Sequence, residues 1–210
     1  NGGSPNYSYE AIPGQTITNA PAPTRTGYTF AGWSGVPARM PNANATYNAN
    51  WTANTYTVTF NANDGDTPTP PNKTVTYAST YGALATTTRQ YYTFNGWFTA
   101  TSGGTQILST TTVSITAPQT LYAQWTPNQY QLNFNANGGS GTMSAQTITY
   151  MTQAAISTNQ STRTGYQFAG WNTQANGGGT FYANGANYTM NTDGATLYAQ
   201  WTPNAYTVTY

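Results

Sequence analysis

The stretch TLYAQW at residues 120–125 alternates between apolar and polar side chains. In an extended chain, Leu121, Ala123 and Trp125 would lie on one face and the residues between them on the other. Alternation with a period of two is the pattern of a strand with one buried face. The same six residues recur at 196–201. The stretch therefore predicts a β-strand that closes a repeated unit.

Two further blocks recur with a similar spacing. The block YTVTF at residues 56–60 returns as YQLNF at 130–134, which is 74 residues later. The copies of a Phe-x-Gly-Trp block are at residues 30–33, 94–97 and 168–171. A fixed period of this length indicates a tandem array of one small module. We expect the first repeat at 1–51, abbreviated and without its opening strand, the second at 56–125, the third at 130–201, and the opening strand of a fourth at 206–210.

The predicted strands are short and separated by turns. In the third repeat the opening strand is followed by Asn137, Gly138 and Gly139, residue types that tolerate the positive φ of tight turns. The glycine of each Phe-x-Gly-Trp block leaves room for a neighbouring ring to lie across the strand. No stretch has good helical periodicity, and residues 81–85 are the best candidate for one short turn of helix. The sequence thus predicts a β-rich α+β module with mostly antiparallel sheets and little helix.

The repeats are joined by linkers of four residues, at 52–55, 126–129 and 202–205. Two of these linkers contain proline. Short linkers with proline behave as semi-rigid joints, so each repeat is expected to have the neighbouring repeats of the array as partners.

The chain is nearly without charge. Charged residues make up 4% of the 210 positions, the net charge is +1, and the five cations are not clustered. Proteins that bind nucleic acids or anionic membrane surfaces need clustered Lys and Arg, so both kinds of partner are excluded. No run of 18 apolar residues occurs, so no membrane insertion of this segment is expected. The absence of Cys excludes disulfides and is common in extracellular bacterial proteins.

The composition also argues against catalysis. Acid–base and nucleophilic catalysis need groups that ionise or attack near neutral pH, and the chain has no His, no Cys and only four acids. These acids are not at equivalent positions of the repeats, so we expect no enzyme, no catalytic residues and no cofactor. Asp64 and Asp66 could offer oxygens to calcium, but the third repeat has Gly138 and Ser140 there. A polar turn without metal is the favoured interpretation.

Three of the five cations occupy one position of the repeat. Arg25, Arg89 and Arg163 each precede the tryptophan of the Phe-x-Gly-Trp block by eight residues. One interpretation is a row of contacts to anions or carboxylates. The favoured interpretation is structural, with the arginine stem packed over tryptophan or tyrosine rings.

The aromatic residues could form either a core or a sugar-binding surface. The six tryptophans are assigned to the core because few other large apolar residues are available. They are Trp33, Trp51, Trp97, Trp125, Trp171 and Trp201. Tyr92, Tyr122, Tyr166 and Tyr198 are the better candidates for an exposed aromatic surface. Tyr122 and Tyr198 alternate with the buried set and should face outward.

Two long motifs carry a family resemblance. The motif TRTGYxFAGW at residues 24–33 and 162–171, together with TLYAQWT at 120–126 and 196–202, resembles the Listeria–Bacteroides repeat, also called the internalin B-type B repeat. The resemblance covers essentially the whole chain. It implies a β-grasp-like fold, a curved sheet crossed by one short helix or loop, in arrays on secreted and surface proteins of bacteria. It implies no catalytic residues.

Three functions remain open at this point. The array is a stalk or spacer, an adhesive region that binds a cell-surface protein or glycan, or a subunit of a self-assembling extracellular filament or sheath, formed for example by strand exchange between copies of the chain. All three place the protein outside the cell, on the bacterial surface or secreted. No residue stands out as a ligand site.

Overall fold

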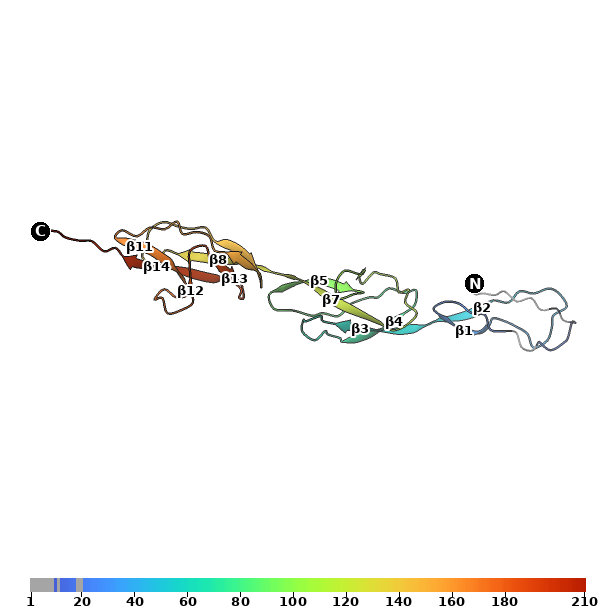
Figure 1. Ribbon diagram of the computed structural model, residues 1–210. Coiled ribbons are helices and arrows are strands. Elements are labelled where there is room, and N and C mark those ends of the chain that lie inside the picture. The colour runs from blue at the N-terminus through green and yellow to red at the C-terminus, as the bar shows by residue number, and fades with distance from the viewer. Residues whose placement is uncertain (1–9, 11, 18–20) are drawn as a thin grey trace. The chain divides into compact units, whose positions relative to one another are not determined.

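The computed structural model describes residues 10, 12–17 and 21–210, which form β-strands joined by turns (Figure 1). No helix occurs in that part of the chain, so the module is all-β. The chain divides into two compact units. The first contains the described residues of Asn1–Thr88 and Phe94–Gln124, and the second contains Arg89–Thr93 and Trp125–Tyr210.

The strands follow the predicted blocks closely. In chain order they are β1 (Tyr28–Trp33), β2 (Ala49–Ala53), β3 (Thr55–Asn61), β4 (Asn72–Thr76), β5 (Tyr92–Phe98), β6 (Gln106–Ile107), β7 (Gln119–Pro127), β8 (Gln129–Asn135), β9 (Gln146–Thr149), β10 (Gln153–Ala155), β11 (Tyr166–Asn172), β12 (Phe181–Tyr182), β13 (Asn187–Thr189) and β14 (Ala195–Pro203). The stretch at 120–125 is the centre of β7, and its copy is the centre of β14, as the alternation predicts.

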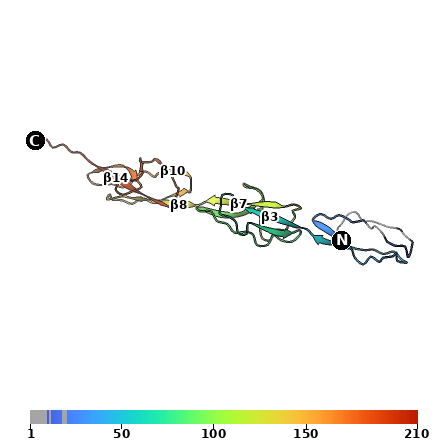
Figure 2. The same ribbon diagram turned by 90° about the horizontal axis from the view of Figure 1, so that it is seen from below.

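The second and third repeats each form a five-stranded sheet of the same topology. The strand orders are β4-β3-β7-β5-β6 and β12-β11-β14-β8-β9. In each sheet the opening strand runs parallel to the closing strand, as β3 does to β7 and β8 to β14. Figures 1 and 2 show β3 beside β7 in both views. The outer strands are added antiparallel, which confirms sheets that are mostly antiparallel.

In its described residues, 10, 12–17 and 21 onward, the first repeat has a smaller part of this sheet. Its β1 and β2 pair antiparallel, with a bulge between Phe30 and Trp33. The equivalent pair in the third repeat, β11 and β14, has its bulge between Phe168 and Gly170. A bulge re-aims the side chains that follow it, which here sets the direction of the tryptophan.

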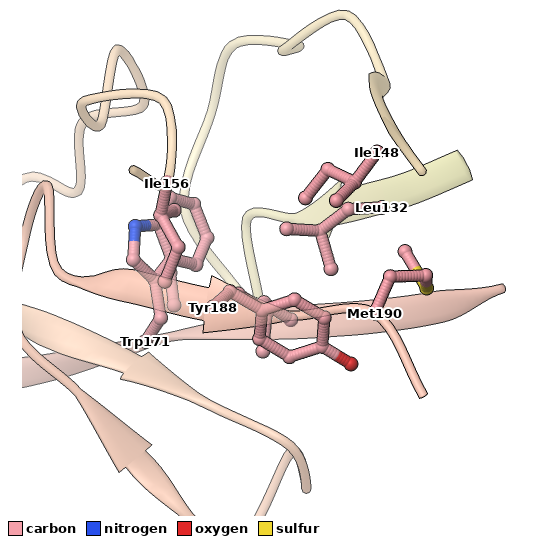
Figure 3. Packing of buried hydrophobic residues seen from close by; sticks show 8 residues of the cluster. Leu132, Ile148, Ile156, Trp171, Tyr188 and Met190 are labelled. Carbon is pink, nitrogen blue, oxygen red and sulfur yellow. The ribbon is translucent and has the colours of Figure 1, made fainter. Parts of the chain in front are cut away.

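The core of the third repeat lies on one face of its sheet (Figure 3). Leu197 and Ala199 of β14 are fully buried, together with Leu132 of β8 and Trp171 of β11. The other buried members are Ile148, Ile156, Tyr188 and Met190. The alternation therefore identified the buried face correctly, and Leu121 and Ala123 of β7 are fully buried in the same way.

The turn of helix expected at residues 81–85 is wrong. Gly82 has φ of +66°, which a right-handed helix does not permit. The segment is instead held by Lys73, whose Nζ donates hydrogen bonds of 2.6 Å to the carbonyl oxygens of both Tyr81 and Ala83. A short apolar run thus forms a loop because its carbonyl groups bond to a side chain on the neighbouring strand rather than to its own backbone.

The space beside the glycine of each Phe-x-Gly-Trp block has different neighbours in each repeat. A Cβ on Gly170 would lie 2.4 Å from the ring of Phe181, which confirms that a ring crosses the strand there. At Gly96 the crossing group is the amide of Gln106, and at Gly32 no atom lies within 4 Å. The ring-over-glycine prediction therefore holds for the third repeat alone.

Candidate functional site: the joints between repeats

The linker between the first and second repeats is fixed by Asn54, and this joint lies entirely within the first unit. The backbone N–H of Asn54 donates to the carbonyl of Gly27 at 2.9 Å, and its own carbonyl accepts from the N–H of Tyr77 at 2.9 Å. Its side-chain oxygen accepts from the Thr29 hydroxyl at 2.6 Å, and its Nδ2 donates to the Tyr56 hydroxyl at 3.4 Å. One linker residue thus bonds to the repeat before it and to the repeat after it.

Asn128 repeats this arrangement within the second unit. Its N–H donates to the carbonyl of Tyr91 at 2.9 Å, and its carbonyl accepts from the N–H of Tyr150 at 2.8 Å. Its side chain accepts from the Thr93 hydroxyl at 2.6 Å and donates to the Tyr130 hydroxyl at 3.3 Å. The same four hydrogen bonds occur at both joints, so the linker asparagine is a recurring structural element of the array.

A third asparagine, Asn204, makes two of these four kinds of bond among the described residues. Asn204 donates from its backbone to the carbonyl of Gly165 at 2.9 Å and from its side chain to the Tyr206 hydroxyl at 3.1 Å. The signal was present in the sequence, since Asn-x-Tyr ends all three linkers at Asn54, Asn128 and Asn204. The sequence does not reveal the role of this asparagine, because its backbone partners at each joint lie far from it along the chain.

Aromatic rings cover the first joint. The ring of Tyr77 packs directly on Gly27, because a Cβ on Gly27 would lie 2.3 Å from the Cγ of Tyr77. Tyr28 meets the same ring edge-on, with centroids 5.4 Å apart. Gly27 has φ of +76°, so both its backbone conformation and its lack of a side chain are required here.

At the second joint, Tyr91 occupies the position equivalent to Gly27. Its φ is +67°, so the backbone keeps the conformation of Gly27. The Tyr91 ring lies against Tyr150 with centroids 4.5 Å apart and meets Tyr130 edge-on at 6.0 Å. Tyr92 completes the cluster at 5.6 Å from Tyr150. The second joint therefore gains aromatic contacts, at the cost of a strained φ for a bulky residue.

Comparison with known proteins explains why the joints recur. The Listeria-Bacteroides repeat domain matches residues 1–55, 56–124 and 130–200, in three tandem copies that cover most of the chain. The chain belongs to the Listeria-Bacteroides repeat family. The family resemblance of the sequence motifs is thereby confirmed.

The relatives of this repeat chain are larger bacterial proteins, and the chain matches a part of each. A protein of Evansella cellulosilytica described as a membrane protein is 30% identical over 217 residues, covering 97% of this chain and 32% of the relative. Internalin H of Listeria monocytogenes is 36% identical over 124 residues, covering 54% of this chain and 22% of the relative. The chain thus spans less than a third of the length of these relatives. No solved structure matches it.

The described residues include no helix that is long and apolar enough to cross a membrane.

The arginines of the Listeria-Bacteroides repeats stack on tyrosine. The guanidinium carbons of Arg25, Arg89 and Arg163 lie 3.9 to 4.0 Å from the ring centroids of Tyr28, Tyr92 and Tyr166. Arg25 also lies 6.0 Å from the ring of Trp51. This stacking is what the structural interpretation predicts, with tyrosine as the main partner, and it occupies the face of each guanidinium group rather than its edge.

The acidic turn of the second repeat is held by hydrogen bonds. The carboxylate of Asp66 accepts from the Thr88 hydroxyl, and the Asp66 N–H donates to the Thr88 carbonyl at 2.7 Å. Asp64 has φ of +70°, typical of a tight turn. In the part of the chain that the structure describes, no group of three or more His, Cys, Asp or Glu side chains could hold a metal ion. The favoured interpretation as a polar turn is consistent with these bonds.

The six tryptophans that were assigned to the core differ in how deeply they are buried. Trp97 and Trp171 are buried, at 2% and 0% exposure. The other four tryptophans are half-buried, and Trp201 packs against the edge of the core. Tyr122 and Tyr198 are half-buried and alternate with fully buried neighbours, so they lie on the outer face as predicted.

Two tyrosines titrate abnormally because they are buried. Burial raises the pKa of Tyr81 above its usual value near 10, and the Tyr81 hydroxyl donates to Gln119 Oε1 at 2.6 Å. Burial, and then the charge of Tyr182, raise the pKa of Tyr188. A raised phenol pKa means that these contacts stabilise the fold fully below pH 10, and that this stabilisation is lost as the pH rises above 10.

A shallow polar hollow, open to solvent, lies where β8 and β14 begin to pair. Its lining residues are Gln129, Tyr130, Gln131, Asn133, Asp193, Gly194, Ala195 and Thr196. Asp193 is the one acid of the third repeat, and the second repeat has Ala117 at the equivalent position. The acid in this hollow is therefore not shared by the second repeat.

Proposed function

We propose that this chain is a non-catalytic repeat region of a bacterial cell-surface protein, in which each repeat acts as a spacer with a fixed joint to the next. The family membership and the relatives described as a membrane protein and an internalin support the surface location. The module itself is a helix-free variant of the β-grasp arrangement, with its first and last strands parallel at the centre of the sheet.

The asparagine joints carry this proposal. A flexible tether needs a linker whose backbone is free to rotate, whereas Asn54 and Asn128 each make four hydrogen bonds to residues on both sides of the linker. Each such bond contributes on the order of 1 kcal/mol, so the set outweighs the entropy of one or two linker residues. A spacer with such joints keeps a distal domain away from the cell wall.

Adhesion is a second candidate function, favoured by the hollow of the third repeat. Amide and carboxylate groups such as those of Gln131, Asn133 and Asp193 suit the hydroxyl groups of a glycan, and Tyr198 lies on the same outer face of the sheet. Filament formation is a further alternative, since a net charge of +1 over 210 residues does little to keep copies of the chain apart.

The joint can be tested with probes on either side of Asn54. The chain has no cysteine, so cysteines at the exposed positions Ser34 and Asn72 would carry two spin labels without competition. We expect a single narrow distribution of distances between these labels by pulsed electron paramagnetic resonance. The substitution Asn54→Ala removes the bonds to Thr29 and Tyr56 and should broaden the distribution about twofold.

The matched control is Asn50→Ala, which removes an exposed asparagine four residues earlier on β2. This variant should leave the distribution unchanged. A distribution that is already broad in the native chain, and equally broad in both variants, would contradict the spacer proposal.

A further inference from the structure

Arg163 holds its guanidinium beside a gap in the surface of the third repeat. Its Cζ lies 3.9 Å from the ring centroid of Tyr166, so the stack orients the plane of the group. A stacked guanidinium keeps its N–H donors pointing outward in that plane, where they match the two oxygens of a carboxylate. The stacked guanidinium of Arg163 can therefore bind a second partner through the N–H groups at its edge.

The gap beside this edge is Gly138. A Cβ built on Gly138 would lie 3.6 Å from the Cζ and Nη1 of Arg163 and 3.9 Å from its Nη2. These are ordinary contact distances, so a small group at this place touches the guanidinium without a clash. A carboxylate attached there would lie within hydrogen-bonding reach of the arginine.

The second repeat shows that the turn accepts such a group. Asp64 occupies the position equivalent to Gly138, and the two residues have φ of +70° and +83°. The preceding residues, Asn63 and Asn137, have φ of +47° and +48°. The turn is thus the same in both repeats, but only the second repeat has a carboxylate in it. The third repeat has Asp193 as its one acid, and Asp193 lines the hollow between β8 and β14.

We propose that Arg163 binds the carboxylate of a uronic acid residue in an acidic polysaccharide, at the place that an aspartate side chain would take on Gly138. The surroundings fit a sugar, because the exposed neighbours Ser140, Thr162 and Thr164 carry hydroxyl groups. The hydroxyls of Ser140 and Thr162 lie 3.4 Å apart and share a hydrogen bond, which leaves each with further capacity to accept one. A nucleic acid would need a cluster of cations to hold its phosphates, and the chain has five cations in 210 residues. The ligand class rests on the proposed surface location, whereas the carboxylate site rests on Arg163 and Gly138 alone.

The test is a titration of the full chain with oligogalacturonate, followed by NMR. We expect saturable shifts of the Arg163 Nε–Hε signal and of the Gly138 amide. The methyl ester of the same oligosaccharide should cause no shift, because it lacks the charge. Polyglutamate provides a peptide arm, and saturation by polyglutamate at equal or higher affinity would overturn the assignment to a polysaccharide.

Two variants make the site itself falsifiable. Arg163→Gln removes the cation, and Gly138→Asp supplies a carboxylate from the chain and so blocks the site. Both should weaken binding at least tenfold, since a charge-assisted bidentate contact is lost. The matched control Gly185→Asp adds the same charge at another glycine with positive φ, where a Cβ meets no atom within 4 Å, and should bind as the native chain does.

Unchanged binding in Arg163→Gln or Gly138→Asp would overturn the proposal, and so would the absence of any shift with oligogalacturonate. Dispersed spectra of both variants would show that the fold is intact. A failure here leaves the spacer proposal in place, because the distance distribution across Asn54 does not depend on Arg163.

Discussion

Replacing Trp171 with alanine is expected to lower the free energy of unfolding of the second unit by about 3–5 kcal/mol, as is typical when a large buried aromatic side chain is deleted. Trp171 is fully buried and packs against the rings of Phe134 and Phe168, with centroids 5.0 and 5.1 Å away. Urea denaturation followed by circular dichroism measures the effect, and a loss below about 1 kcal/mol would contradict the assignment of Trp171 to the core.

A conservative pair of variants separates ring volume from hydrogen bonding. The Nε1 of Trp97 donates to the Ala85 carbonyl at 2.8 Å, whereas the buried Nε1 of Trp171 has no hydrogen-bond partner among the described residues. Trp97→Phe leaves a buried carbonyl without its donor, and Trp171→Phe removes an unsatisfied donor. We expect Trp97→Phe to cost about 1 kcal/mol more than Trp171→Phe. Equal costs would contradict a net contribution from the hydrogen bond between Trp97 and Ala85.

The substitution Gly27→Ala should destabilise the first unit by about 2–5 kcal/mol and release the joint at Asn54. A non-glycine residue at φ of +76° costs about 1–2 kcal/mol. The new Cβ would also lie 2.3 Å from the Cγ of Tyr77, which is the root of the ring and cannot simply rotate away. Displacing the ring adds about 1–3 kcal/mol. Denaturation of the variant measures the sum.

Gly165→Ala is the matched control for this change. Gly165 has φ of +80°, and a Cβ there meets no atom within 4 Å. The backbone cost is therefore the same as at Gly27, without the clash. The difference between the two variants isolates the contact of Gly27 with Tyr77, and equal losses would show that this contact adds nothing to the joint.

The strands and the buried face were predictable because they depend on local alternation. The order Leu121, Tyr122, Ala123 alone separates inner from outer side chains, and it recurs in the closing strand of the third repeat. The helix at residues 81–85 was not excluded by the sequence, since the decisive contacts come from Lys73 on another strand. Local patterns cannot show where a distant side chain supplies hydrogen bonds.

The joints were less accessible to sequence reasoning for a related reason. Asn54 bonds to Gly27 and Tyr77, which are 27 and 23 residues away, and no local pattern relates these positions. The recurrence of Asn at each linker was visible, but its partners were not. The arginine position was recognised from the spacing of Arg25, Arg89 and Arg163, and its stacking on tyrosine follows the expectation that its stem covers aromatic rings.

Hydrogen exchange at the joints tests the spacer account most directly. The amides of Tyr77 and Tyr150 donate to the carbonyls of Asn54 and Asn128. If the joints are fixed, these two amides should exchange within about tenfold of the rate of the Val58 amide in the centre of β3. Exchange of Tyr77 and Tyr150 at the rate of an unstructured peptide, while Val58 stays protected, would show that the linkers are flexible tethers and would contradict the account.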